Sequence, residues 1–320
     1  MTGHAASVQR SSGTGGWGGK LVIAHPERKA QRSLQRLAGA TLCPVEVVAD
    51  LDAALATVDE STIAVIDAQL ALGRPDLRSK PACAWIAVPG EGLAPAEADC
   101  VSTLLAAGWD HVITHPMPLL ADELLATAQK LIRREPFGLE KYMAWGAEIR
   151  DFKLDDALDR DAVVGLVAAD IGKVGLPERI GSLVSVIADE LLANALYVAP
   201  VDAAGVRCHA ADARDKSRPL AGRDIVTLRW GTDGRYLAIE VRDRWGSIVP
   251  ETIAPRLATT KSPTADGGMG LPLAYACSNQ LVINLAPGAL TEVIALLDIR
   301  YKPTELARSA SFHTFIGEAP

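Results

Sequence analysis

Short apolar, β-branched runs alternate with helical stretches along the first 135 residues of the chain. The runs read KLVIAH, VEVVAD, TIAVIDA, ACAWIAVPG and HVITHPMP, and helical segments such as ADELLATAQKLIRRE lie between or after them. Strands that take turns with helices pair in parallel, with the helices covering both faces of the sheet. The pattern therefore predicts an α/β domain over residues 20–135, built on a doubly wound, parallel sheet.

The second half of the chain follows a different order. Two helical stretches, LDRDAVVGLVAADIGKVG and ERIGSLVSVIADELLANALYVAP, precede a hairpin, DIVTLRWGTDGRYLAIEVRDRWG, and the strands QLVINLAPG and LTEVIALLDI come last. Helices grouped against an antiparallel sheet predict an α+β two-layer sandwich, here over residues 148–302. Residues 1–19 are then expected to form a disordered leader, residues 136–147 a linker and residues 303–320 a C-terminal tail.

The helix that contains ADELLANALYVAP places two polar side chains on its apolar side. At about 100° per residue, Glu190 and Asn194 fall inside the arc formed by apolar residues such as Ile187 and Leu191. Because they are four residues apart, their side chains also project next to each other. Burial of an unpartnered carboxylate and amide costs several kcal/mol. Either this end of the helix meets water, or something polar binds there.

Composition and charge narrow the classes of function. The chain has 320 residues, 49% of them hydrophobic, which suits two ordinary globular domains. No apolar run approaches the ~18 residues of a membrane span, and the N-terminus lacks the apolar centre of a signal peptide. The net charge is −7, and Lys and Arg form no cluster typical of nucleic-acid binding. We expect a cytoplasmic protein that contacts neither membranes nor nucleic acid, with five scattered, reduced cysteines.

The first domain resembles a response-regulator receiver domain, most clearly in LLAAGWDHVITHPMP. In that family an Asp at the end of the third strand is phosphorylated with the help of Mg²⁺, an acidic pair and a Lys. Asp67 stands at the phosphoacceptor position. His25 and Pro26 replace the acidic pair, so that only Glu27 remains, and His115 replaces the Lys. Mg²⁺ needs several oxygen ligands, and we therefore interpret this domain as a pseudo-receiver in which Asp67 is inactive.

The second domain resembles the GHKL ATPase superfamily, which includes histidine-kinase catalytic domains, Hsp90 and the serine kinases that act as anti-sigma factors. The likeness rests on Glu190 and Asn194, then Asp243, then the glycines of GGMG, in that order. It implies that ATP and Mg²⁺ are bound, with Asn194 on the Mg²⁺, Glu190 as general base and Asp243 on the adenine amino group. Gly268 and Gly270 would admit the phosphates, and Lys261 with Thr260, in the lid loop, could reach a phosphate.

The glycine motif after the hairpin departs from that family. Where Asp-x-Gly-x-Gly is usual, this chain reads DRWGSI, with Trp245 and Ser247 at the glycine positions. The remaining glycine, Gly246, is one residue out of step, and the resemblance implies that it is among the nucleotide-binding residues. Trp245 could stack near adenine, or it could fill the base pocket and exclude the nucleotide. Both arrangements stay open from the sequence.

The leading hypothesis is a signal-transduction protein in which a pseudo-receiver regulates an ATP-dependent protein kinase or an ATPase switch. Its partners would be ATP and another signalling protein, and the two families make a homodimer plausible. The first alternative is a non-catalytic adaptor in which both domains have lost their chemistry. The second is a histidine kinase that acts in trans, because no His occurs between His115 and His209 to serve as its own phosphoacceptor.

Overall fold

The structure is a computed structural model of the chain. It describes residues 19–74, 76–77, 80–90, 97–115, 119, 121–258, 270–300 and 309–320. The expected leader lies outside the described residues except for its last position, and so do Thr260, Lys261 and Gly268 of the expected lid loop.

The predicted parallel sheet is present in the N-terminal half. Its strands run in the order β2-β1-β3-β4-β5, all in parallel, which is the flavodoxin-like doubly wound order. The central strands are buried along almost their whole length and mainly apolar because helices cover both faces. The elements are β1 (Lys20–Ala24), α1 (Arg28–Gly39), β2 (Val45–Val48), α2 (Leu51–Thr57), β3 (Thr62–Asp67), α3 (Ala68–Leu72), β4 (Ala84–Val88), α4 (Glu97–Ala106), β5 (His111–Val112) and α5 (Ala121–Arg133).

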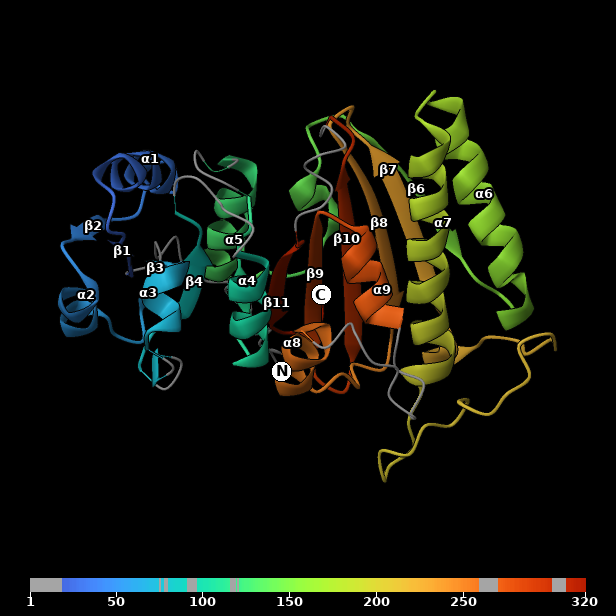
Figure 1. The fold of residues 1–320 in the computed structure, drawn as a ribbon. Helices are drawn as coiled ribbons and strands as arrows, with labels where there is room; N and C mark the ends of the chain where they lie inside the picture. Colours follow the sequence, from blue (N-terminus) through green and yellow to red (C-terminus); the bar gives the residue numbers. More distant parts are fainter. Residues whose placement is uncertain are drawn as a thin grey trace, which may run out of the picture.

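The C-terminal half is an antiparallel sheet in the order β9-β10-β8-β7-β6, with helices α6, α7 and α9 packed on one face (Figure 1). The elements are η2 (Leu139–Tyr142), β6 (Glu148–Lys153), η3 (Ala157–Asp159), α6 (Arg160–Lys173), α7 (Glu178–Ala193), η4 (Asn194–Val198), η5 (Gly222–Asp224), β7 (Thr227–Thr232), β8 (Tyr236–Asp243), α8 (Pro250–Ala258), α9 (Gly270–Cys277), β9 (Gln280–Ala286), β10 (Leu290–Asp298) and β11 (Ser311–Ile316).

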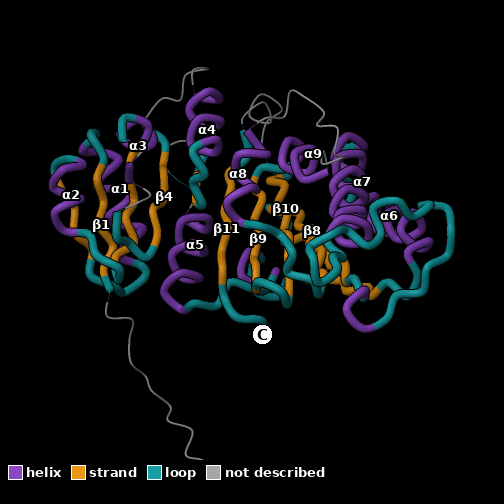
Figure 2. Tube along the Cα trace, turned by 90° about the horizontal axis from the view of Figure 1, so that it is seen from below, coloured by secondary structure: helices purple, strands orange, loops and turns teal. Residues whose placement is uncertain are grey.

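The two halves share one 11-stranded sheet, which differs from the two separate sheets that the sequence pattern favoured. β11 lies within the segment expected to be a C-terminal tail, and it pairs antiparallel with β5 and parallel with β9. Figure 2 shows the strands as one row, with α4, α8 and α9 on one side and α5 on the other. Helix α4 packs on α8, and a single buried apolar cluster includes both Leu104 and Ile253, so the core continues across the join.

The segment expected to be a linker packs against the sheet face opposite α7. The backbone N–H of Gly138 donates to the Glu292 carboxylate, which also accepts from Arg242 at 2.6 Å and from the Asn284 amide at 2.6 Å. Asn284 in turn accepts from Lys130 of α5 at 2.7 Å. Buried polar groups are stabilising only when their partners are present. This network therefore ties α5, the linker and strands β8 to β10 to one another.

One helix among the described residues is long and apolar enough, by length and composition alone, to cross a membrane. It is α7 with its continuation η4, Glu178–Val198, whereas the sequence analysis expected no such segment. This helix carries Asp189 and Glu190 in its middle and packs against α6, α9 and β8. A core helix of a globular domain has the same composition, since it is buried on several sides.

Candidate functional site

In the receiver-like half, Asp67 lies at the end of β3, and both of its carboxylate oxygens have partners within the protein. Asp67 is 3% exposed, and its Oδ1 accepts two hydrogen bonds of 3.0 Å from backbone N–H groups in the first turn of α3. Its Oδ2 lies 3.4 Å from Nε2 of the fully buried His25. The Nδ1 atom of His25 accepts from the backbone N–H of Glu27 at 3.1 Å, so His25 presents Nε2 to the carboxylate. The side chain of Asp67 thus caps α3 and contacts an imidazole.

No three His, Cys, Asp or Glu side chains within the part of the chain that the structure describes could together hold a metal ion. At the Asp67 position, the imidazole of His25 occupies the side of the carboxylate that faces β1 and the residues after β4. Asp67 was expected to be an inactive phosphoacceptor, and that expectation stays a prediction.

In the C-terminal half, Glu190 and Asn194 lie where α7 changes from an α-helix to the π-helical turn η4. Short π-helical segments inside helices are frequent at functional sites. The Nδ2 of Asn194 donates to the Glu190 backbone carbonyl at 2.9 Å, which leaves its Oδ1 to other partners. Both side chains are partly exposed. The polar pair is therefore at a half-open end of the apolar face.

Gly270 at the start of α9 lies directly against this pair. A Cβ atom at Gly270 would be 2.6 Å from Asn194 Nδ2 and 2.8 Å from Glu190 Oε2. Real Cβ atoms do not approach polar atoms this closely, so any larger residue at this position would displace the ends of the Asn194 and Glu190 side chains. Three of the residues singled out from the sequence are thus brought together, although they come from segments 76 positions apart (194 to 270).

A cavity of about 230 Å³ extends from Asn194 to Asp243 at the end of β8. Apart from these two residues its lining is mainly apolar, from η4, α8, α9 and β10. Thr291, which is directly opposite Asp243 on β10, also lines it, and its buried hydroxyl lies close enough to the Asp243 carboxyl to lower the pKa of that group. A carboxyl and a hydroxyl therefore lie next to each other in the wall of the cavity.

The backbone of the turn that follows Asp243 holds the Asp243 side chain in place. Its Oδ1 accepts from the backbone N–H of Trp245 at 2.8 Å and of Gly246 at 3.4 Å. Burial raises the pKa of Asp243 to about 6, against these two N–H groups, which lower it. Burial, followed by the charge of Asp189, also raises the pKa of Glu190. Two carboxylates with raised pKa values thus lie near one cavity, a property typical of functional sites.

Trp245 is not among the residues that line the cavity. Its ring instead lies under the guanidinium of Arg223 at 4.4 Å, a cation–π arrangement outside the cavity. Ser247 lines the cavity. Trp245 therefore does not fill this cavity, and its stacking near adenine stays a prediction.

Gly246 has a structural reason to be glycine. Its φ is +54°, and a Cβ atom there would be 2.2 Å from the backbone oxygen of Ala286 and 2.7 Å from the nitrogen of Ala289. The close approach is therefore to the turn between β9 and β10. The expectation that Gly246 also takes part in nucleotide binding stays a prediction.

Sequence reasoning missed Thr291 and the segment after η4, from which Val201 and Arg207 line the cavity. Thr291 could have been found by pairing the predicted strands, because in the observed register it is opposite Asp243. The residues after η4 carry no such signal.

Comparisons with known proteins give one likeness to report. No protein-family model matches the sequence, and no curated protein matches it. Among solved structures, the chain is similar to the Rec1 receiver domain of ShkA, crystallised in complex with c-di-GMP. The two are 26% identical over 35% of this chain and 91% of that one, with a TM-score of 0.27.

Proposed function

We propose that the cavity between Asn194 and Asp243 binds ATP with Mg²⁺, and that the protein is an ATP-dependent protein kinase or ATPase switch in signal transduction. The observation that carries this proposal is that Asn194 and Asp243 line the same cavity, while Glu190 and Gly270 lie directly against Asn194.

The far end of the cavity suits a purine base. Asp243 accepts two backbone hydrogen bonds on Oδ1, and the Thr291 hydroxyl lies beside the carboxyl. An adenine amino group would donate to the other carboxylate oxygen. The volume of about 230 Å³ is below the roughly 300–1,000 Å³ of most ligand pockets. It suits the base, and the phosphates must therefore extend toward the Asn194 end.

The near end suits the phosphates and their metal ion. Asn194 offers a side-chain oxygen, and Mg²⁺ is commonly held by a few protein oxygens together with phosphates and water. Gly270 begins α9, whose amino-terminal end attracts negative charge. When bound, Mg²⁺ neutralises charge on the phosphates during transfer. The residues present are therefore compatible with the group that the family likeness implies.

Glu190 is the candidate base for the reaction. Its raised pKa makes the carboxylate a better proton acceptor than an exposed Glu. In this role it orients and deprotonates an attacking water or a partner's hydroxyl. The receiver-like half would then act as a regulatory unit without phosphorylation, because both oxygens of Asp67 already have partners.

Isothermal titration with ATP and Mg²⁺ tests the binding step. We expect micromolar affinity in the wild type and at least an about tenfold loss in Asn194→Ala and Asp243→Asn, since each removes a hydrogen-bonding group from a desolvated site. The exposed Asp161→Asn is the matched control. Absence of heat in the wild type would favour the non-catalytic adaptor.

Turnover of labelled ATP tests the reaction step. Glu190→Gln should lower the rate by about two orders of magnitude or more while ATP affinity is retained, because the amide cannot accept the proton. Glu178→Gln, on the exposed first turn of the same helix, is the control. An unchanged rate in Glu190→Gln would remove the base from the proposal.

A further inference from the structure

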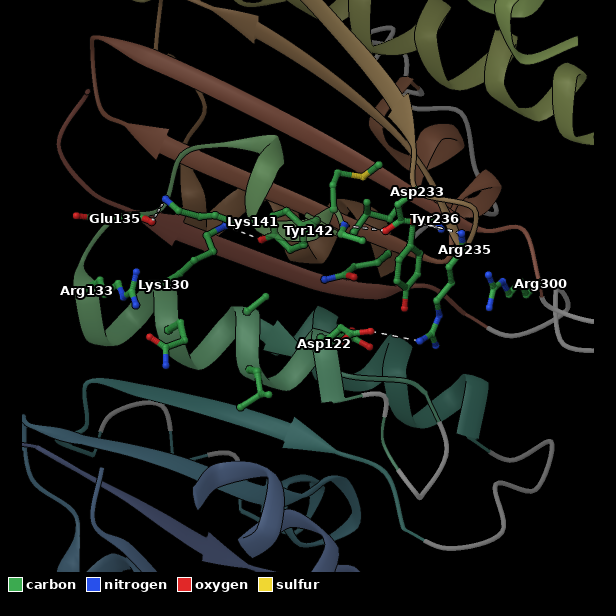
Figure 3. Close-up of a pocket in the computed structure, with 18 residues that line it drawn as sticks. Asp122, Lys130, Arg133, Glu135, Lys141, Tyr142, Asp233, Arg235, Tyr236 and Arg300 are labelled. Carbon is green, nitrogen blue, oxygen red and sulfur yellow. Dashed lines mark hydrogen bonds and ion pairs between the residues drawn. The ribbon is translucent and has the colours of Figure 1, made fainter. Parts of the chain in front are cut away.

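A second and larger cavity lies on the opposite face of the sheet, at the junction of the two halves. Its volume is about 580 Å³, within the roughly 300–1,000 Å³ typical of small-molecule sites. Figure 3 shows α5 forming one wall, while Tyr142 and the start of β8 form the other. Nothing in the ATP proposal uses these residues.

The lining contains a buried donor that lacks an acceptor. Gln280 is 6% exposed, and its Nε2 has no hydrogen-bond partner among the described residues. A buried amide N–H without an acceptor costs on the order of 1–3 kcal/mol. Because Gln280 lines the cavity, a bound molecule with an acceptor group would remove that cost.

Most acidic side chains around the cavity already have partners within the protein, whereas some basic side chains have unused N–H donors. The acidic side chains that line it are largely engaged: Asp122 pairs with Arg235, Asp233 accepts from three backbone N–H groups, and Glu123 contacts His313 at 3.2 Å. Glu135 remains on the exposed rim.

Two cationic side chains have N–H groups that make no hydrogen bond to a described residue. Arg133 makes no polar contact with any described residue, and the guanidinium of Arg300 uses only Nε, which donates to the Gly234 carbonyl at 2.9 Å. A planar guanidinium with free N–H groups favours carboxylate or phosphate oxygens. The unused donors of the cavity are therefore suited to an anion.

Two tyrosines provide flat surfaces between these ends. Tyr236 is 9% exposed, and Tyr142 accepts a hydrogen bond from Lys130 at 2.6 Å, which fixes its ring against α5. Figure 3 places Tyr142 and Tyr236 between Lys130 on one side and Arg300 on the other. Rings held in this way pack well against a planar ligand.

We propose that this cavity binds a small planar aromatic molecule that carries an anionic group. The ring lies against Tyr142 and Tyr236, and the anion is bound by the free guanidinium groups of Arg133 or Arg300. Such a ligand touches α5 of the receiver-like half and β8 and β9 of the other half at once. The binding free energy of the ligand therefore depends on the relative position of the two halves.

Calorimetric titration of the full chain with 1-naphthyl phosphate and with 1-naphthol tests the site. The two probes share the ring and differ in the anion. We expect one equivalent of 1-naphthyl phosphate to bind, about tenfold or more tighter than 1-naphthol, because the charged group gains hydrogen bonds from guanidinium. Equal affinity of the two probes, or no binding of the phosphate, would overturn the proposal.

Variants locate the binding. Ala126→Trp places an indole into the cavity from α5 and should abolish binding, whereas Ala169→Trp on the exposed face of α6 should not. Arg133→Gln should weaken 1-naphthyl phosphate by about threefold to tenfold and leave 1-naphthol unchanged, with the exposed Arg36→Gln as control. If Ala126→Trp does not fold, Gln280→Ala replaces it. Retained binding in the variant used would show that the site lies elsewhere.

Discussion

Gly246→Ala probes the tightest backbone contact at the end of β8. The residue has φ +54°, a left-handed conformation that costs a non-glycine residue about 1–2 kcal/mol. The added Cβ would also be 2.2 Å from the Ala286 oxygen and 2.7 Å from the Ala289 nitrogen. Both atoms belong to the backbone, so the turn between β9 and β10 must shift, at a further cost of about 1–3 kcal/mol typical of overpacking. We expect a total loss of about 2–5 kcal/mol in the free energy of unfolding.

Gly175→Ala isolates the cost of the left-handed conformation. Gly175 has φ +75°, and a Cβ there would meet nothing within 4 Å. Its substitution should therefore cost only the conformational penalty of about 1–2 kcal/mol. Urea unfolding followed by circular dichroism measures both losses, provided that the slope of the transition is unchanged. The difference between the two variants is the cost of the backbone contact.

Two results would refute this reasoning. Equal losses in the two variants would mean that the turn accommodates the methyl group without cost. A Gly246→Ala protein of wild-type stability that no longer bound ATP would mean that Gly246 contacts the nucleotide, as the family likeness implied, and that its packing on the turn is incidental.

Three further outcomes are expected. Gly270→Ala should weaken ATP binding about tenfold or more at nearly unchanged stability, because its Cβ displaces Asn194 and Glu190, whereas unchanged affinity would separate Gly270 from the site. Adenosine, which has no phosphate to titrate, should bind about tenfold more weakly at pH 5 than at pH 7.5. The reason is that Asp243, with a pKa of about 6, is protonated at the lower pH and no longer offers a carboxylate acceptor. Asp243→Asn should abolish this pH dependence. Phe312→Ala, in the fully buried centre of β11, should cost about 3–5 kcal/mol in urea unfolding, and a loss below 1 kcal/mol would contradict the central place of that strand.

The pKa of Asp243 has a second consequence, for stability. The folded protein holds this proton up to about pH 6, whereas the unfolded chain releases it near the ordinary value of 3.8. The folded state therefore binds more protons between these values, and the contribution of Asp243 to stability falls as the pH rises from about 4 to about 6. If the proposed nucleotide bound here, its amino group would donate a hydrogen bond to the ionised carboxylate and offset this cost.

The strands of the N-terminal half could be predicted from the sequence because the residues of each strand by themselves indicate a buried strand. β1 and β3 are buried on both faces, so their residues are mostly apolar, and the helices between them fix the parallel direction. The polar pair on α7 was also visible, because a helix with a 3.6-residue period shows at once which side chains fall on the wrong face.

β11 could not be predicted in the same way. Its sequence SFHTFI mixes Ser, His and Thr with two Phe residues, and its neighbours β5 and β9 lie far away in the chain. Ser311 is held by a hydrogen bond of 3.0 Å from the backbone N–H of Thr114, a contact that spans 197 positions. A strand whose polar side chains are satisfied only by distant partners looks like a loop until the fold is known.

The position of β11 constrains how the two halves can communicate. Strands β5 and β9 are joined through β11 by backbone hydrogen bonds, and Lys130 adds a buried contact to Asn284. A rigid-body rotation of one half against the other would break these bonds, and it would leave buried polar groups without partners at a cost of several kcal/mol. A hinge of the kind found between linked domains is therefore unfavourable here. A signal that passes between the halves must use small shifts within the continuous sheet, or a ligand that contacts both halves where α5 faces β8 and β9.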